Sequence, residues 1–322
     1  MLKMNKIYLG DCLEVSNDIE SGSVDLVLTD LPFGTIKGVP KNWKPANKPA
    51  HEWDIVIPTP KIMELANRIL RKNGKMVLFA QQPFTTELIN NAIPNLPYSY
   101  SCIWEKDNFA NCLSAKKACV NYYEDILVFS KKHDTEDLHP LRNYLKECKQ
   151  KSGMTNKKFN HLFSDYTNKK GNRDRSVLEH YWAPAQFCLP TEDVYKNILQ
   201  PTGFFKTPYE ELKQIDNEFK KQFASTFNLW QGKKYKSNIF KYKKDYNGFH
   251  PTQKPILLLE DLIKTFSNEN DLVVDLTCGS GSTCVAAKNT NRRFIGIEKE
   301  KKYYDISVKR LKECQVKNQL FR

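Results

Sequence analysis

The 322-residue sequence lacks several features that would assign it to whole classes of protein. It has no N-terminal basic-then-apolar segment of the secretory type and no apolar run of membrane length, so we expect a soluble, cytoplasmic protein without a membrane partner. Its nine cysteines include no C-x-x-C pair, which argues against zinc, and no metal is expected. The pattern G-x-x-x-x-G-K-[S/T] is absent, so a P-loop is not supported.

Acidic residues are too few to balance the basic ones, and the formal net charge is +13. Residues 131–250 carry 23 Lys and Arg against 14 Asp and Glu. This concentration favours a polyanion partner, although a solubilising surface would have the same composition. Within it, residues 232–244 interleave lysines with aromatic residues, which indicates either phosphate contacts or a solvated basic strand. The candidate DNA-binding lysines are Lys233, Lys234, Lys236, Lys241, Lys243 and Lys244.

Two stretches near opposite ends of the chain share one pattern, in which a short apolar strand ends in an acid and a turn. Residues 24–35, VDLVLTDLPFGT, place Asp30 after the first strand. Residues 272–284, LVVDLTCGSGSTC, place Asp275 before a Gly-x-Gly loop and a helix start. Because ligands of open α/β sheets bind at the carboxyl ends of the strands, both turns are candidate ligand sites.

Together these motifs resemble those of the β-group amino-methyltransferases of DNA, which move a methyl group from S-adenosylmethionine to an exocyclic base nitrogen. Asp30-Leu31-Pro32-Phe33 matches the catalytic Asp-Pro-Pro-Tyr motif of that family, with Leu for the first Pro and Phe for Tyr. Asp275 to Gly281 matches the cofactor loop, and residues 250–255, HPTQKP, match a motif that precedes this loop. The catalytic motif comes first, which is the order of the β group.

The resemblance implies an α/β fold of the Rossmann-like methyltransferase type, a mostly parallel seven-stranded sheet with helices on both faces. We expect residues 1–130 to form the catalytic half, 131–245 a mainly helical, basic target-recognition insert, and 246–322 the cofactor-binding half. Gly153 lies between two short amphipathic segments of the insert and suggests a helix–turn–helix, a known way to place a helix in the major groove. The alternative is a helical insert that only packs.

The resemblance also implies methylation of adenine N6 in duplex DNA. Phe33 would stack on a flipped-out base, while the Asp30 carboxylate and the Leu31 carbonyl, in the turn made with Pro32, would accept the two amino hydrogens. In this family an acid at the first motif position favours adenine and Ser favours cytosine. Cytosine-N4 methylation and a catalytically silent DNA-binding regulator stay open as alternatives. A homodimer and a partner restriction endonuclease are also left open.

The residues expected to bind S-adenosylmethionine lie in the cofactor loop, the motif before it and two strand ends. Lys254 would meet the methionine carboxylate, and Glu298, at the end of the next strand, would bind the ribose hydroxyls. Asp11 would accept from the adenine amino group, although it is equally suited to cap a helix. Glu124 also matches the family but suggests no separate chemical role. The full expected set is Asp11, Thr252, Lys254, Asp275, Thr277, Gly279, Gly281, Ser282, Thr283 and Glu298.

Overall fold

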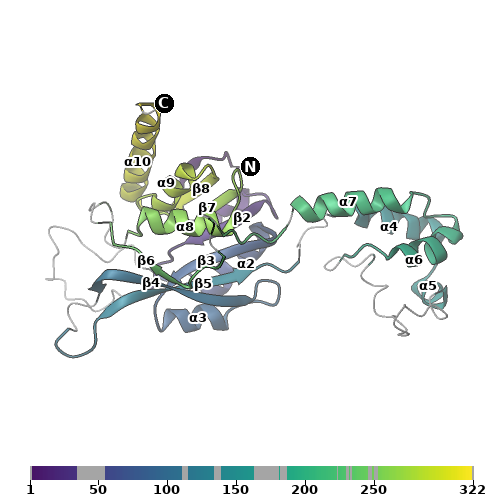
Figure 1. The fold of residues 1–322 in the computed structure, drawn as a ribbon, viewed down its shortest axis with the longest axis horizontal. Coiled ribbons are helices and arrows are strands. Elements are labelled where there is room, and N and C mark those ends of the chain that lie inside the picture. The colour runs from purple at the N-terminus through teal and green to yellow at the C-terminus, as the bar shows by residue number, and fades with distance from the viewer. Residues whose placement is uncertain are drawn as a thin grey trace. The chain divides into compact units, whose positions relative to one another are not determined.

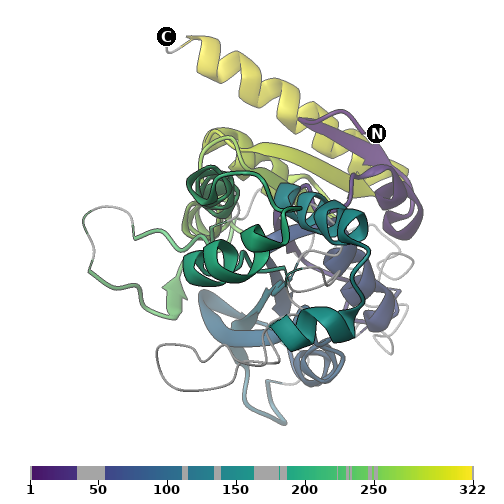
Figure 2. The same ribbon diagram turned by 90° about the vertical axis from the view of Figure 1, so that its right-hand side faces the viewer.

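The computed structural model describes residues 2–34, 55–110, 115–133, 139–162, 181, 187–222, 224–229, 232, 234–245, 249 and 253–320. The chain divides into two compact units, one formed by Met1–Lys132 with Ser225–Arg322 and the other by His133–Ala224 (Figures 1 and 2). None of the helices in the described ranges is both long enough and apolar enough to cross a membrane.

The larger unit is built on a mixed sheet of eight strands in the order β1-β8-β7-β2-β3-β5-β4-β6 (Figure 1). From β1 to β3 neighbouring strands pair parallel, β5 is antiparallel to β3 and β4, and β6 pairs parallel with β4. The strands are β1 (Lys6–Leu9), β2 (Val24–Thr29), β3 (Leu70–Ala80), β4 (Tyr98–Ala110), β5 (Asn121–Ser130), β6 (Ile239–Lys241), β7 (Leu272–Asp275) and β8 (Arg293–Glu298).

The sheet thus has one strand more than the seven that the resemblance implied. The added strand is β6, which has three residues and pairs with the long strand β4 at the edge of the sheet. From the sequence this segment was assigned to the insert. In the structure the smaller unit ends at Ala224 rather than at 245, because the chain from Ser225 onward packs with the larger unit.

Helices cover both faces of the sheet, as the resemblance implied. On one face α1 (Cys12–Val15), α2 (Thr59–Ile69) and α3 (Phe84–Asn90) pack over a core that includes Val27 of β2. On the other face α8 (Ile256–Phe266), α9 (Ser282–Asn289) and α10 (Lys301–Leu320) pack over Leu28 of the same strand. Because successive residues of a strand point to opposite faces, a strand covered on both sides is mostly apolar. This explains why Val24, Leu26, Val27 and Leu28 of β2 are all apolar, with Asp25 as the polar exception among them.

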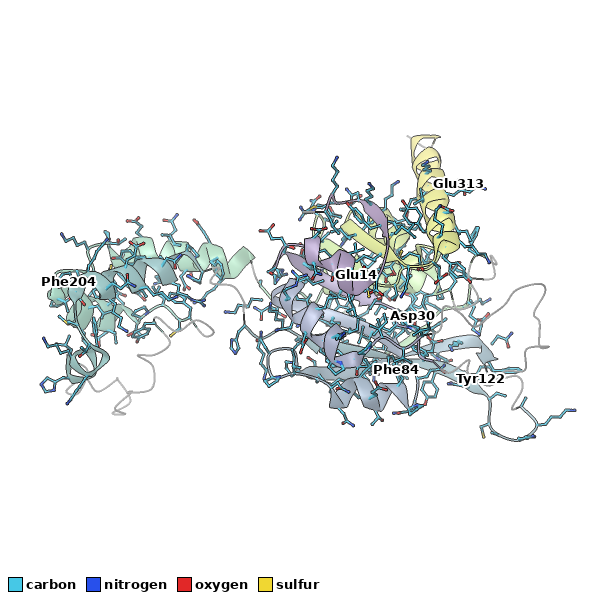
Figure 3. The ribbon with its side chains drawn as sticks, turned by 180° about the vertical axis from the view of Figure 1, so that it is seen from behind. Glu14, Asp30, Phe84, Tyr122, Phe204 and Glu313 are labelled. Atoms are coloured by element: carbon cyan, nitrogen blue, oxygen red, sulfur yellow. The ribbon has the colours of Figure 1, made fainter. Side chains whose placement is uncertain are left out.

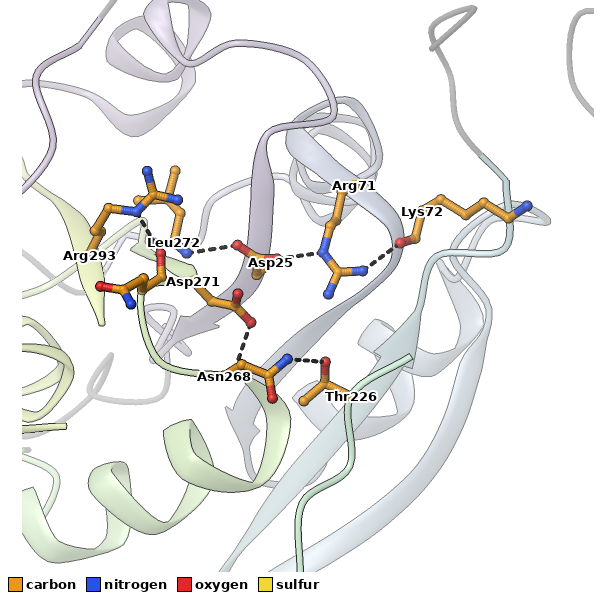
Figure 4. Close-up of polar contacts among 9 residues, drawn as sticks. Asp25, Arg71, Lys72, Thr226, Asn268, Asp271, Leu272 and Arg293 are labelled. Atoms are coloured by element: carbon orange, nitrogen blue, oxygen red, sulfur yellow. Dashed lines mark hydrogen bonds and ion pairs between the residues drawn. The ribbon is translucent and has the colours of Figure 1, made fainter. Parts of the chain in front are cut away.

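A polar network ties together the amino ends of the central strands (Figure 4). Asp25 in β2 accepts hydrogen bonds from Arg71 Nε of β3 and from the Leu272 N–H of β7, the latter at 2.7 Å. Nearby, the Asn268 N–H donates to Asp271 at 2.7 Å, in the segment before β7. A buried carboxylate is tolerated only when it is paired, and Asp25 meets this condition. The network holds the amino edge together and leaves the functional side chains at the opposite edge.

The carboxyl edge of the parallel strands gathers the acids that the sequence placed in separate motifs. Asp30 follows β2, Asp275 ends β7 and Glu298 ends β8, and these three strands are parallel and near one another in the sheet. The antiparallel strand β5 begins at this same edge, because its Asp125 pairs with Ala80 at the end of β3. Glu124 is therefore brought to the edge where Asp30 lies.

The smaller unit is helical and has its own apolar core, which includes Leu145, Tyr195 and Phe205. Gly153 ends α4 with a left-handed φ of 61°, so the tight turn into α5 that the sequence indicated is present. The described helices of this unit are α4 (Pro140–Ser152), α5 (Asn156–Leu162), α6 (Glu192–Val194), η4 (Tyr195–Leu199), η5 (Gln200–Thr202) and α7 (Tyr209–Gln222).

Candidate active site

Asp30 lies directly after β2 (Figure 3). It forms an ion pair with Lys254, which precedes α8. Lys254 Nζ donates to Asp30 Oδ2 at 2.5 Å, although the two residues are 224 positions apart in the chain. The second oxygen, Oδ1, is buried and has no hydrogen-bond partner among the described residues. Burial raises the pKa of Asp30 to about 6; Lys254 opposes the rise, and the carboxylates of Glu124 and Asp275 add to it.

Lys254 is shared between two carboxylates. Its Nζ lies 3.2 Å from Glu124 Oε2, and Glu124 Oε1 is 2.6 Å from Lys106 Nζ of β4. Burial disfavours the charged form of Glu124, but Lys254 and Lys106 outweigh it and hold its pKa below the usual value. Burial acts against the charge of Lys254 too, yet Asp30 and Glu124 raise its pKa above the ordinary value. The four side chains therefore form an alternating row of charges at the carboxyl edge.

The cofactor loop is tied to the catalytic turn by Thr277. Its hydroxyl Oγ1 donates to the backbone carbonyl of Asp30 at 2.9 Å and lies 2.9 Å from Thr29 Oγ1, while its N–H donates to Asp275 Oδ1 at 3.2 Å. Burial raises the pKa of Asp275, against hydrogen bonds from Thr283 and Thr29. Asp275, Thr277 and Thr283 are thus bonded within the protein, and they shape the loop.

The glycines and Glu298 order the other side of this loop. The Gly279 N–H donates to Glu298 Oε2 at 2.7 Å, and the Glu300 N–H donates to Oε1 at 2.7 Å. Burial raises the pKa of Glu298. Gly281 has a left-handed φ of 80°, and a Cβ atom there would lie 2.8 Å from Ser307 Cβ of α10. Gly281 is therefore required by the packing of α10, a reason that the sequence did not show.

Two residues that the sequence analysis did not select support the same loop. Arg310 Nη1 of α10 donates to the Ser280 carbonyl at 2.7 Å and lies 3.2 Å from Ser282 Oγ. Gln253 Oε1 accepts from Ser280 Oγ at 3.2 Å, whereas its buried Nε2 has no partner in the described part of the chain. Gln253 belongs to the HPTQKP motif and was therefore within reach of the sequence. Arg310 carried no sequence signal, because its function depends on where α10 packs.

The remaining predicted residues lie on the cofactor side of the site, in the catalytic turn or, for one of them, outside the described residues. Asp11 caps α1, accepting from the Leu13 N–H at 2.9 Å, and pairs with Lys299 at 3.1 Å. Leu31 is buried, and Phe33 is half-buried, with its ring centroid 5.4 Å from that of Phe84. Pro32 joins them in the turn. Thr252 lies outside the described residues.

Lys236, which was predicted to bind DNA, makes its contacts inside the protein. It forms an ion pair with Asp261 of α8, its side chain is 11% exposed, and Nζ lies 5.1 Å from the centre of the Phe240 ring. Asp261 Oδ2 also accepts from the Tyr242 hydroxyl at 2.7 Å. An ammonium group held in this way is poorly placed to meet a phosphate, so the ion pair argues against the predicted DNA contact of Lys236. Its spacing in the sequence matched that of the exposed lysines.

The other lysines of the basic run are more accessible. Lys234, Lys241 and Lys243 are exposed, and Lys244 is half-buried. Lys241 pairs with Glu105 at 3.1 Å, with 72% of the lysine side chain exposed, an arrangement that salt and competing ligands readily break. Lys233 lies outside the described residues.

The chemistry of the site suits a ligand that is both donor and acceptor. Next to the glycine loop, Asp30 Oδ1 is a buried acceptor and Gln253 Nε2 a buried donor, each lacking a partner among the described residues. Leaving buried polar groups unpaired costs about 1–3 kcal/mol each, so such groups mark places where a ligand completes the hydrogen bonding. No group of His, Cys, Asp and Glu suited to a metal ion occurs within the ranges that the structure describes.

Comparison with known proteins finds relatives that are named as DNA methyltransferases. Type II methyltransferase M.HindIII of Haemophilus influenzae is 36% identical over 124 residues, covering 35% of this chain and 40% of that protein. DNA adenine methyltransferase YhdJ of Escherichia coli is 25% identical over 309 residues, covering 95% of this chain and 82% of YhdJ. The first relatives are thus matched over well under half of their own length: 40% for M.HindIII and 35% for M2.LlaDCHI of Lactococcus lactis.

The solved structure of the M1.HpyAVI–SAM complex superposes with a TM-score of 0.52 at 20% identity, covering 95% of this chain and 98% of that one. This likeness confirms the Rossmann-like methyltransferase fold. The family model described as DNA methylase, of the N6/N4 type, matches residues 24–309 and so spans both the catalytic turn and the cofactor loop. The chain therefore belongs to the N6/N4 DNA methylase family.

Proposed function

We propose that this protein transfers the methyl group of S-adenosylmethionine to the N6 amino group of a flipped-out adenine in duplex DNA. The observation that carries the proposal is the position of Asp30. It lies beside the glycine loop, tied to it through Thr277, and its buried Oδ1 has no partner among the described residues. A carboxylate oxygen in this state is suited to accept a hydrogen from an exocyclic amino group.

The catalytic turn supplies the contacts to the base. An adenine inside a duplex is out of reach, so the base must leave the stack, and the ring of Phe33 stacks on it and offsets roughly 1–3 kcal/mol of that cost. Phe84 supports Phe33 from α3, with ring centroids 5.4 Å apart. Asp30 Oδ1 and the Leu31 carbonyl accept the two amino hydrogens. This draws the nitrogen toward tetrahedral geometry and directs its lone pair to the incoming methyl group. Asp30 then holds the released proton.

The cofactor side of the site would hold S-adenosylmethionine, which supplies an electrophilic methyl group when bound. Glu298 offers carboxylate oxygens to the ribose hydroxyls, and Asp11 offers an acceptor to the adenine amino group. Gln253 Nε2 adds a buried donor beside the loop. Lys254, expected to meet the methionine carboxylate, would do so only by sharing its charge with Asp30 and Glu124.

The choice of adenine over cytosine rests on Asp30 and on the relatives. YhdJ, which aligns with 95% of this chain, is named a DNA adenine methyltransferase. The exposed lysines Lys234, Lys241 and Lys243 and the helical unit His133–Ala224 are the proposed contacts to DNA and its target sequence. A restriction endonuclease partner would fit relatives named type II methyltransferases, such as M.HindIII.

Methyl transfer from labelled S-adenosylmethionine into duplex DNA, followed by nucleoside analysis of the digest, tests the proposal. N6-methyladenine is the expected product, and Asp30→Ala should abolish it while leaving cofactor binding intact. If the product is N4-methylcytosine, the target base is cytosine and not adenine, but the reaction is still methyl transfer to an exocyclic amino group. Unlabelled DNA together with bound cofactor would overturn the activity and favour a DNA-binding regulator.

A further inference from the structure

We infer that Glu124 is a positioning residue for Asp30: by sharing Lys254 with it, Glu124 keeps Asp30 a strong hydrogen acceptor. This inference rests on the proposed function of the site. The family resemblance included Glu124 but suggested no role for it. In the structure it is the one described carboxylate, apart from Asp30, that pairs with Lys254.

The geometry places Lys254 between two competing anions. Nζ lies 2.5 Å from Asp30 Oδ2 and 3.2 Å from Glu124 Oε2, and its side chain is 7% exposed, so water screens neither contact well. The ammonium group also lies 5.0 Å from the centre of the Phe79 ring, which limits its movement. Part of the lysine charge is therefore directed to Glu124, and Asp30 is neutralised less than in an isolated pair.

Lys106 makes this arrangement possible. A buried carboxylate with only half a partner would be protonated, but Lys106 Nζ lies 2.6 Å from Glu124 Oε1, with 2% of the lysine side chain exposed. Lys106 itself lies 5.3 Å from the centre of the Trp104 ring on the same strand. Lys106 of β4 thus keeps Glu124 of β5 ionised, and the Glu124 carboxylate stays as a negative charge at a fixed place beside Lys254.

The charges that face Asp30 make the direction of the effect clear. They are Lys254 from the segment before α8, Glu124 from β5 and Asp275 from β7; Lys106 is one step further away, behind Glu124. Glu124 acts on Asp30 directly as a like charge and indirectly by competing for Lys254. Both effects raise the affinity of Asp30 for a proton, so removing Glu124 must lower it.

The decisive measurement is the titration of Asp30 in the protein without cofactor or DNA, followed by carbon-13 NMR of labelled aspartate side chains. The Asp30 signal is assigned by its loss in Asp30→Asn. We expect a midpoint near 6 in the wild type. In Glu124→Gln we expect it at lower pH by roughly one unit, the lower end for a charged neighbour at this range. In Lys254→Met it should move to higher pH.

Two variants provide the controls. Glu105→Gln removes an acid from the neighbouring strand β4, with 46% of its side chain exposed and an exposed lysine partner, and should leave the Asp30 midpoint unchanged. Glu124→Asp keeps the charge and should retain most of the wild-type midpoint. If Glu124→Gln does not fold, Lys106→Gln with Glu124→Gln removes both buried charges, keeps the net charge and should shift the midpoint in the same direction.

Methylation kinetics complete the test. Glu124→Gln should lower kcat by up to about tenfold, the limit set by one pKa unit of acceptor strength, without raising KM for DNA. It should also move the acidic limb of the pH profile to lower pH. An Asp30 midpoint that stays in place or rises in folded Glu124→Gln overturns the inference. Failure of the wild type to methylate DNA would overturn the proposed function alone, since the titration needs no activity.

Discussion

The hydroxyl of Thr277 donates a 2.9 Å hydrogen bond to the backbone carbonyl of Asp30, and this bond joins the cofactor loop after β7 to the catalytic turn after β2. The two turns come from strands that are neighbours in the sheet, although Asp30 and Thr277 are 247 positions apart in the sequence. The group that accepts the amino hydrogen and the loop that positions the methyl donor are thus held to one another directly.

Thr277→Val should separate these two turns without changing the shape of the side chain. We expect a loss of about 1–2 kcal/mol in the free energy of unfolding, because the hydroxyl contacts both the Asp30 carbonyl and Thr29 Oγ1 and one hydrogen bond is worth about 1 kcal/mol. We also expect a lower kcat for methylation. Thr86→Val is the control, because the exposed Thr86 hydroxyl donates to the exposed Gln82 side chain, at 2.8 Å, away from both turns. A stability loss with an unchanged kcat would mean that Thr277 has no part in aligning the turns.

Gly281→Ala should destabilise the protein for two separable reasons. The φ of 80° costs a side chain about 1 kcal/mol, and the new Cβ would lie 2.8 Å from Ser307 Cβ, which adds about 1–3 kcal/mol of overpacking. Gly203→Ala is the matched control, with a φ of 81° and nothing within 4 Å. Urea unfolding of each variant, followed in the unit that carries it, should show the larger loss for Gly281→Ala.

The double variant Gly281→Ala with Ser307→Gly tests the contact itself. Removing the Ser307 Cβ should recover the overpacking part of the loss and leave the part due to φ. If the second change recovers nothing, the collision with α10 is not the reason for the glycine.

Lys236→Gln and Lys241→Gln should behave oppositely. Lys236 is buried against Asp261, so Lys236→Gln removes a positive charge from beside a buried carboxylate and should cost about 3 kcal/mol of unfolding free energy. Lys241 pairs with Glu105 in solvent, where such a pair is worth about 0–1 kcal/mol. Chemical denaturation of the two variants measures the difference, and equal losses would contradict the assignment.

In DNA binding we expect the opposite order of effects: the exposed lysine matters and the buried Lys236 does not. Removing one lysine–phosphate interaction lowers the slope of log K against log salt by about 0.9, so Lys241→Gln and Lys243→Gln should flatten the slope. Lys236→Gln should leave it as it is. Affinities measured across a salt series decide this, and an unchanged slope in the Lys241 and Lys243 variants would make the basic run a solvated surface.

Asp216→Asn should weaken the smaller unit at neutral pH. Asp216 accepts from His139 Nε2 at 3.2 Å and pairs with Lys220 at 2.6 Å. Burial alone would raise the pKa of Asp216, but His139 and Lys220 hold it below the usual value. A lowered carboxyl pKa stabilises the folded state above the unfolded-state pKa, and the gain is lost as pH falls through the folded pKa.

The wild type should therefore exceed Asp216→Asn by about 1 kcal/mol at pH 7, and the gap should close below about pH 4. Urea titrations of the smaller unit at both pH values give the comparison. Asp193→Asn serves as the control, because Asp193 of α6 is exposed and its carboxylate accepts from the exposed amide of Asn197 in η4. A gap that widens in acid would reverse the sign assigned to this pair.

The sequence by itself determined the features that depend on short stretches. The apolar runs of β2 and β7, the acids at their ends, the glycine turn and the left-handed Gly153 all follow from local pattern and backbone preference, and the order of the two motifs indicated the family. Asp11 was left with two readings, and the structure shows the N-cap while the cofactor contact stays a prediction.

Only the tertiary structure decided which distant side chains meet. Lys254 faces Asp30 and Glu124, Lys236 faces Asp261, and Gly281 faces Ser307, because sheet order and helix packing bring those segments together. It also placed β6 in the sheet and ended the helical unit at Ala224. Charge and spacing along a chain cannot distinguish a lysine that faces solvent from one that faces a buried carboxylate. That difference is set by pairings between residues far apart in sequence, and it determines which charges are left to act on a substrate.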